Sequence, residues 1–384
     1  MLLPIELKDI RFIEVSDEVG GEDIWLKRIS ALYGKKPSII WRKDSPMPDF
    51  KDLKINKITY FFLKLFNRVS TNLARGFFLN MLLFTCKLSR FDGITFFSTT
   101  YVPVPRGKNI ISYIHTPSRR MTVDFNDTKN SILKISRKKY ILLLFFRIAY
   151  LISYKMSLDH SKINLCNSQN VRDRVINFCN RSTEVLYPTQ NVLEFYNNTY
   201  GNYFLFVSRL ERYKRQDYAL MAFKLFFSEN KNYRLVMLSP SPKRKDEVEF
   251  YKELILYVEQ NELPVDFCLD LNRSEVIERY ANAYACLFTA KGEDLGQIPI
   301  ESMSAEKPII AVNDRGPSET IIDGVTGYLV SNEREMAEKM IFLVNHPDVT
   351  EQMGKNGRIR AMEFFNDSVF KARLDKIIND FSKL

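Results

Sequence analysis

The feature that most constrains the fold is a repeated alternation of short apolar runs with helix-like segments along all 384 residues. Runs rich in β-branched and aromatic residues predict strands in the first half at 10–15, 38–42, 94–98, 109–115, 163–167 and 184–187. In the second half they predict strands at 203–208, 234–239, 265–269, 285–289, 308–312 and 327–330. Alternation of this kind predicts parallel sheets joined by right-handed helical crossovers. We therefore expect an α/β chain with two doubly wound domains.

The length suits two domains, since a single core rarely extends over so many residues. The expected division is an N-terminal Rossmann-like domain at 1–190, a linker at 191–202, a C-terminal Rossmann-like domain at 203–367, and a helix at 368–384 that crosses back to the first domain. Ligands of open α/β sheets bind at the carboxyl ends of the strands. Two parallel sheets facing across a cleft would hold a donor on one wall and an acceptor on the other.

Composition excludes several classes of protein. Apolar residues make up 45% of the chain and charged residues 27%, which excludes disordered and collagen-like chains. The N-terminal run MLLPIELKDI lacks a basic region followed by an apolar core, so no signal peptide is expected. The five cysteines are scattered and contain no C-x-x-C pair, which favours reduced, buried thiols in a cytoplasmic protein over disulfides or a zinc site. They are Cys86, Cys166, Cys179, Cys268 and Cys286.

Positive charge is concentrated in the first half. Residues 51–150 hold 18 Lys and Arg against 4 Asp and Glu, while the whole chain carries a net charge of +10. Such a field attracts phospholipid headgroups, lipid pyrophosphates or nucleic acid, and the alternative is a solvated basic face.

Aromatic segments occur in the same region, at 58–66, 76–86 and 140–153. Each is shorter than the ~20 apolar residues that span a bilayer, and Arg147 interrupts the third. They are expected to be either buried core helices or a face that lies on a membrane. The basic run SRKKY at 136–140 favours the membrane-lying face.

The strongest motif is KGEDLGQIPIESMSAEKPIIAVNDRGPSETIIDGVTGYLV at 291–330. Glu293 falls in the loop after a predicted strand, and Glu301 falls on the following helix, which begins near Gly296. Glycine at that position lets backbone N–H groups approach an anion. Carboxylates accept hydrogen bonds from adjacent sugar hydroxyls, so the pattern favours a sugar ligand.

A second motif, FLFVSRLERYKRQDYAL at 204–220, places two cations at the end of the first strand of this half. Arg209 follows the strand directly, and Lys214 lies five residues later at a helix start. Two cations there favour a diphosphate ligand and would neutralise charge on a leaving nucleotide. The alternative is surface charge in a loop.

Together these motifs resemble glycosyltransferase family 4, the retaining transferases with the two-Rossmann-domain GT-B architecture. The resemblance covers most of the chain. It is strong over 203–330, weak over 45–100, and includes NSQNVRDRVINF…EVLYPTQNVLEF at 167–195. SYIHTPSRR at 112–120 resembles the H-T-P segment of mannosyltransferase-like members from bacterial surface-polysaccharide pathways, and EVGGED at 18–23 resembles the Gly-Gly loop of the family.

The resemblance implies roles for individual residues. Arg209 and Lys214 would hold the donor diphosphate, Glu293 the sugar hydroxyls and Glu301 the ribose hydroxyls. The remaining implied positions are Gly296, Gln297 and Ile298 at the donor, Gly20 and Gly21 near the phosphates or acceptor, and His115 facing the transferred sugar. The residues expected to act in catalysis are His115, Arg209, Lys214 and Glu293.

In this family, retention of the anomeric configuration is usually explained by attack of the acceptor hydroxyl on the face that the phosphate leaves. The departing phosphate takes the proton of that hydroxyl. No D-x-D tripeptide occurs in the chain, so no metal or other cofactor is expected. Two positions depart from the family pattern. Leu295 replaces a usual aromatic, and Arg315 replaces the first of two common glycines, where it would crowd the donor or add a contact to it.

The predicted function is transfer of a hexose, with mannose from GDP-mannose as the first choice and a UDP-sugar as the other donor considered. The expected acceptor is a glycan or a polyprenyl-diphosphate-linked glycan of surface polysaccharide or lipopolysaccharide synthesis. We expect a cytoplasmic enzyme peripheral on the inner, anionic face of the membrane.

Three alternatives stay open. A nucleotide-sugar 2-epimerase shares the architecture but needs more acids and histidines than a chain with 3 histidines offers. A nucleic-acid-binding protein would fit the positive charge, but no motif supports it. A catalytically inactive subunit that binds a sugar nucleotide would not need all four of the charged residues Arg209, Lys214, Glu293 and Glu301.

Overall fold

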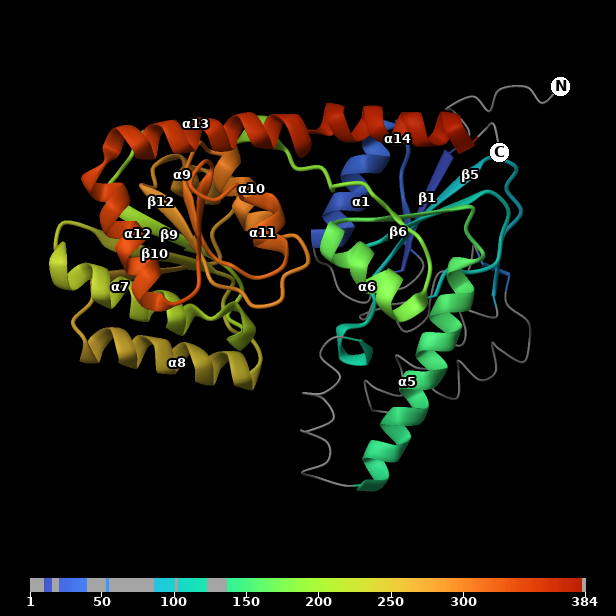
Figure 1. Ribbon diagram of the computed structural model, residues 1–384, viewed down its shortest axis with the longest axis horizontal. Helices are drawn as coiled ribbons and strands as arrows, with labels where there is room; N and C mark the ends of the chain where they lie inside the picture. The colour runs from blue at the N-terminus through green and yellow to red at the C-terminus, as the bar shows by residue number, and fades with distance from the viewer. Residues whose placement is uncertain are drawn as a thin grey trace. The chain divides into compact units, whose positions relative to one another are not determined.

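A computed structural model describes residues 10–15, 21–39, 53–54, 86–100, 103–122 and 137–381. The chain divides into two compact units (Figure 1). The first unit contains Met1–Pro188 and Phe370–Leu384, and the second contains Thr189–Val369. Residues 191–202, predicted as a linker, belong to the second unit and include the short helix η2 (Val192–Glu194).

The first unit contains a parallel sheet with the order β2-β1-β5-β6-β7-β8 in its described part. These strands are β1 (Ile10–Val15), β2 (Ser38–Ile39), β5 (Ile94–Thr99), β6 (Ile110–Ile114), β7 (Ile163–Cys166) and β8 (Glu184–Val185). The central strands β5 and β6 are buried along their whole length, as expected of strands covered on both faces. A separate antiparallel pair joins β3 (Leu53–Lys54) to β4 (Lys87–Leu88).

Helices cover both faces of this sheet. Alternate side chains of each strand point to opposite faces, which creates two separate cores. One core includes α5 (Arg137–Leu158) and α6 (Gln169–Cys179), and the other includes α1 (Gly21–Leu32) and α14 (Asp367–Phe381). The short helix η1 (Arg119–Met121) lies beside α5.

The second unit repeats the plan with a parallel sheet of order β11-β10-β9-β12-β13-β14. The strands are β9 (Tyr203–Val207), β10 (Arg234–Ser239), β11 (Val265–Leu269), β12 (Ala285–Phe288), β13 (Ile309–Val312) and β14 (Gly327–Val330). One face packs on α7 (Gln216–Glu229), α8 (Lys245–Gln260) and α12 (Glu333–Asn345), and the other on α9 (Arg273–Ala281) and α10 (Gln297–Ser304). The unit also contains η3 (Arg212–Lys214), α11 (Gly316–Thr320) and α13 (Pro347–Phe364).

The predicted fold class is confirmed, because both units are doubly wound α/β layers around a parallel sheet. None of the five cysteines, all of which lie in the described residues, forms a disulfide. Four are buried, but Cys268 is only half-buried because it lies on the edge strand β11. No helix in the described part of the chain is long and apolar enough to cross a bilayer.

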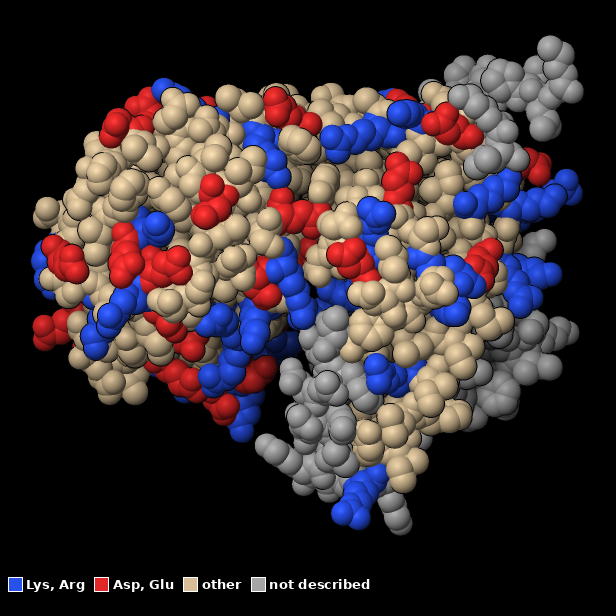
Figure 2. Space-filling view, viewed as in Figure 1, with Lys and Arg blue, Asp and Glu red and all other residues tan. Residues whose placement is uncertain are grey.

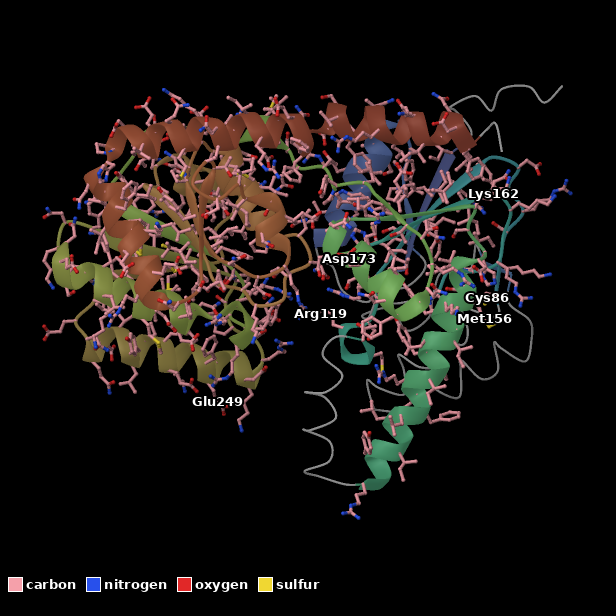
Figure 3. The ribbon with its side chains drawn as sticks, in the orientation of Figure 1. Cys86, Arg119, Met156, Lys162, Asp173 and Glu249 are labelled. Atoms are coloured by element: carbon pink, nitrogen blue, oxygen red, sulfur yellow. The ribbon has the colours of Figure 1, made fainter. Side chains whose placement is uncertain are left out.

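The aromatic segments have different outcomes. The segments 58–66 and 76–85 lie outside the described residues, and 140–153 falls inside α5. One side of α5 is buried in the core of the first unit, whereas the other side exposes large apolar side chains. In Figure 3 Met156 is labelled in the C-terminal part of this helix.

Candidate active site

The second unit has a topological switch point between β9 and β12. From β9 the chain continues to β10 and β11 on one side, then returns to β12 on the other side of β9. Crossovers on opposite faces leave a crevice at the carboxyl ends of the two central strands. The loops that follow β9, β12 and β13 meet at this edge, and those after β9 and β12 carry Arg209, Lys214 and Glu293.

Lys214 and Glu293 form an ion pair across the switch point. The loop after β9 is held in place by Thr289, whose hydroxyl donates to the carbonyls of Lys214 (2.7 Å) and Arg215 (2.8 Å). Arg215 closes η3 in the left-handed region with φ 57°, and α7 starts directly after it. The Lys214 and Glu293 side chains are 15% and 23% exposed, so their charges face each other at a partly buried site.

Arg209 lies on the same loop as Lys214 but is more exposed. Its side chain is 59% exposed, and Nη2 lies 3.3 Å from both the Tyr213 hydroxyl and Glu211 Oε2. The amide of Gln216 braces the loop by donating to the Arg209 carbonyl over 2.7 Å. The structure therefore places Arg209 and Lys214 on one braced loop, with Arg209 facing solvent and Lys214 facing Glu293.

The loop after β12 turns sharply into α10. Gly296 has φ 86° and caps the helix, which begins at Gln297 and Ile298. Backbone N–H groups of a first helical turn lack partners inside the helix and carry partial positive charge. This helix start therefore offers anion-binding donors at the same sheet edge as Lys214.

A neighbouring loop after β13 is tied to the same region. The backbone N–H of Gly316 donates to the Glu293 carbonyl over 3.0 Å. A Cβ at Gly316 would lie 2.5 Å from the Leu295 Cα, so only glycine permits this close approach. Arg315 adopts φ 47° and ψ −113°, a strained conformation for a side-chain-bearing residue, and its Nη1 is buried without a hydrogen-bond partner among the described residues.

Glu301 lies in a second, more buried group. Its side chain is 8% exposed, and Oε1 accepts hydrogen bonds from Gln190 Nε2 and Arg273 Nη1, each over 2.9 Å. Oε2 accepts from the Tyr280 hydroxyl over 3.0 Å. Burial raises the pKa of Glu301, and the guanidinium of Arg273 opposes that increase. Two carboxylate oxygens accept about four hydrogen bonds, so these contacts leave one acceptor position for a ligand.

Arg273 contacts several members of this group. It forms ion pairs with Glu301 and Glu194, and its guanidinium carbon lies 4.9 Å from the centroid of the Phe195 ring. It is the first residue of α9, whose start is fixed by a capping box between Asn272 and Glu275. The side chain is 48% exposed, so Arg273 connects the buried carboxylate to the surface.

His115 and Gly21, two predicted residues of the first unit, lie at the carboxyl end of its sheet. His115 follows β6 and is buried, and its Nε2 lies 3.0 Å from the Ser98 hydroxyl at the end of β5. The Trp25 ring meets the imidazole edge-on with 4.9 Å between centroids. Gly21 is the first residue of α1, and Gly20 lies outside the described residues.

A family model described as glycosyl transferases group 1 matches residues 194–360, which contain both motifs and every residue of the switch-point site. The match covers less than half of the chain, so the likeness to group 1 glycosyltransferases is that of residues 194–360. The chain's curated relatives include alpha-1,3/1,6-mannosyltransferase ALG2 of Dictyostelium discoideum, which is 31% identical over 189 residues, or 46% of this chain and 45% of that protein. ALG2 of Mus musculus is 28% identical over 293 residues, covering 70% of this chain and 67% of that protein. A capsular polysaccharide biosynthesis glycosyltransferase, CapM of Staphylococcus aureus, is 28% identical over 46% of each chain.

The chain thus spans about half the length of the first of these relatives. Solved structures share the fold over nearly the whole chain. HepE of Anabaena in complex with UDP superposes with a TM-score of 0.66 at 13% identity, covering 97% of this chain and 100% of that one. Sucrose-phosphate synthase from Thermosynechococcus elongatus gives a TM-score of 0.66 at 15% identity, covering 96% and 98%.

Sequence reasoning missed three residues that hold Glu301: Gln190, Arg273 and Tyr280. Arg273 had a usable signal, because the N-x-x-E pattern at 272–275 predicts a helix start just after strand β11. A helix that starts after a parallel strand begins at the ligand-binding edge of the sheet. Gln190 and Tyr280 had no such signal.

Proposed function

We propose that this protein is a glycosyltransferase that transfers a hexose, with mannose as the first choice, from a nucleotide diphosphate sugar with retention of configuration. The observation that carries the proposal is the Lys214–Glu293 ion pair at the switch point, with Arg209 on the same loop and the start of α10 at the same edge. A cation beside a carboxylate matches a donor in which a diphosphate adjoins a sugar. The names of the mannosyltransferase relatives support mannose, and UDP bound to HepE supports a nucleotide donor.

In this proposal the donor takes over the contacts of the resting ion pair. Lys214 and Arg209 bind the diphosphate together with the N–H groups of Gln297 and Ile298, and Glu293 turns to the sugar hydroxyls. Charge that develops on the diphosphate as it leaves meets cations that are already in place. Glu301, held by Arg273, offers its remaining acceptor position to the ribose hydroxyls.

Retention follows from attack on the same face that the diphosphate leaves. The bond between the anomeric carbon and the diphosphate oxygen breaks, and a bond forms from the acceptor oxygen to that carbon. The proton of the acceptor hydroxyl passes to the departing phosphate oxygen. We assign no protein nucleophile, and we propose that charge on the diphosphate is met by Arg209 and Lys214 without a metal. His115, buried beside Ser98, is proposed to contact the transferred sugar.

We also propose that the acceptor is a glycan or a lipid-linked glycan of surface polysaccharide or lipopolysaccharide synthesis, and that the enzyme works at the cytoplasmic face of an anionic membrane. The relative named for capsular polysaccharide biosynthesis supports this class of acceptor. The positive charge of residues 51–150 supports an anionic surface or a diphosphate-linked lipid.

The test is thermal unfolding with a panel of GDP-, UDP- and dTDP-sugars, followed by transfer to a lipid-linked acceptor. A bound donor raises Tm because it binds only the folded state. We expect one donor to raise Tm, Lys214→Ala to abolish the increase, and Lys245→Ala to retain it, since Lys245 is 92% exposed on α8. Interconversion of free nucleotide sugars without acceptor would favour a 2-epimerase instead, and no response to any nucleotide would contradict the proposal.

A further inference from the structure

Helix α5 exposes a continuous apolar stripe. Its members recur every three or four residues, which places them on one side of the helix. They are Ile141 (67% exposed), Phe145 (61%), Ile148 (57%), Ile152 (54%) and Met156 (48%). At 1.5 Å per residue the α5 stripe is about 22 Å long. Scattered exposed apolar residues are ordinary, but a ridge of five on one helix marks a contact surface.

The opposite side of α5 is fixed in the first unit, so the stripe does not turn inward. Leu143, Tyr150, Tyr154 and Leu158 are each at most 5% exposed. The Tyr150 hydroxyl also accepts a hydrogen bond from the Ser118 backbone over 2.8 Å. Rotating the helix to bury the stripe would expose this set, so the stripe is a stable feature of the surface.

Charge around the α5 stripe selects the kind of partner. No Asp or Glu occurs between Arg137 and Leu158. Arg137 is the first residue of α5, Lys155 lies in its last turn, and Arg147 donates to the Met121 carbonyl of η1 over 3.0 Å. Figure 2 shows a flank without charged residues over the visible part of α5, with positive charge at its end and no negative charge on it.

We propose that the α5 stripe lies in the interface of a bilayer that contains anionic lipids. A bilayer interface offers an apolar interior beside negative headgroups, which matches an apolar ridge with cations at both ends. The helix lies along the surface, because no described helix is able to span a bilayer. The inference rests on the proposed function in one respect. The membrane contact would hold the enzyme where a lipid-linked acceptor is found.

The experiment is sedimentation of the full chain with vesicles of phosphatidylcholine alone or mixed with phosphatidylglycerol. We expect binding to the anionic vesicles that weakens with salt and is much lower on neutral vesicles. The triple variant I141S/I148S/I152S is expected to reduce partitioning by at least about tenfold, because three large apolar side chains no longer leave water. The matched control L225S/L256S/I359S changes three side chains of the second unit that are 42%, 52% and 56% exposed, and it is expected to bind like the wild type.

A second variant tests the location directly. Ile148→Trp places a fluorophore on the stripe, and brominated phosphatidylcholine in the anionic vesicles is expected to quench it. Three outcomes would overturn the inference: no vesicle binding by the wild type, equal loss in both triple variants, or no quenching of the new tryptophan. Self-association that I141S/I148S/I152S abolishes without any vesicle binding would assign the stripe to a second copy of the chain. The nucleotide-induced change in Tm, measured on the same variants, separates failure of this inference from failure of the proposed function.

Discussion

Gln190 donates a hydrogen bond from its side-chain amide to the carboxylate of Glu301, with 2.9 Å between Nε2 and Oε1. The backbone N–H of Gln190 donates to the Phe365 carbonyl over 2.7 Å. One residue near the start of the second unit thus contacts both helix α10 and the segment that leads into α14. The two hydrogen bonds of Gln190 therefore hold both the Glu301 carboxylate and the local path of the chain.

Replacing Gln190 by alanine removes one of three donors to a buried carboxylate. We expect Gln190→Ala to lower the free energy of unfolding by about 1 to 2 kcal/mol, because a buried acceptor loses its partner. Urea unfolding measures the change. The control is Gln352→Ala, since the Gln352 amide donates to Asn356 at an exposed site on α13. Equal changes in the free energy of unfolding would show that the hydrogen bond to Glu301 contributes no more to stability than the exposed one.

Arg273→Met is expected to make stability depend more strongly on pH. Burial already raises the pKa of Glu301 above its ordinary value of 4.5, and Arg273 opposes that increase. Without the guanidinium the pKa rises further. An acid with a higher pKa in the folded state holds its proton more tightly there, so its contribution is most favourable below about pH 4.5 and is lost as pH rises toward the folded pKa.

The destabilisation by Arg273→Met should therefore be smaller at pH 5 than at pH 8, as measured by urea unfolding across that range. Glu194 also pairs with Arg273, and Gln190 and Tyr280 face the same carboxylate, so a second variant isolates Glu301. R273M/E301Q has no titrating group at position 301. The additional pH dependence should disappear in it, and its persistence would assign the effect to Glu194.

Glu293→Gln separates binding of the nucleotide from binding of the sugar. The substitution removes the carboxylate that pairs with Lys214, which leaves the cation available to a diphosphate. We expect the Kd for the nucleotide diphosphate to stay the same or decrease, while kcat/KM for the nucleotide sugar falls about 10- to 100-fold through loss of charged hydrogen bonds. Glu253→Gln removes the acid of an exposed Arg212–Glu253 pair and should change neither quantity. Weaker binding of the nucleotide itself in Glu293→Gln would contradict the proposed exchange of partners.

The fold was largely predictable because its signals are local. The run YFLFVS at 203–208 predicted β9 at Tyr203–Val207, and ACLFT at 285–289 predicted β12 at Ala285–Phe288. Strands buried on both faces are continuous apolar runs, which are easy to recognise. The pair β3 and β4 was not predicted, because each strand is a leucine–lysine pair without the β-branched or aromatic residues that indicate strands.

The site was predictable only in part, because its contacts join distant residues. The spacing of Glu293 and Glu301 located both acids but did not distinguish a partly exposed ion pair from a buried carboxylate. That difference comes from Gln190, which lies 111 positions before Glu301 in the sequence, and from Arg273, which lies 28 positions before it. Contacts between residues so far apart in the sequence depend on the order of the strands in the sheet. Sequence periodicity carries no information on that order.

Arg315 is expected to lower the free energy of unfolding and to strengthen donor binding. Its φ of 47° strains a residue that bears a Cβ, and its Nη1 is buried without a partner among the described residues. Arg315→Gly relieves the strain, so we expect the free energy of unfolding to rise by about 0.5 to 1 kcal/mol. The same change removes a cation next to the Gly316–Glu293 contact, so the Kd for the nucleotide sugar should increase. Arg315→Ala keeps the strained Cβ and loses only the cation, and it should weaken the donor without gaining stability. Urea unfolding and donor titration of the two variants check this, and equal stability of Gly and Ala at position 315 would refute the strain argument.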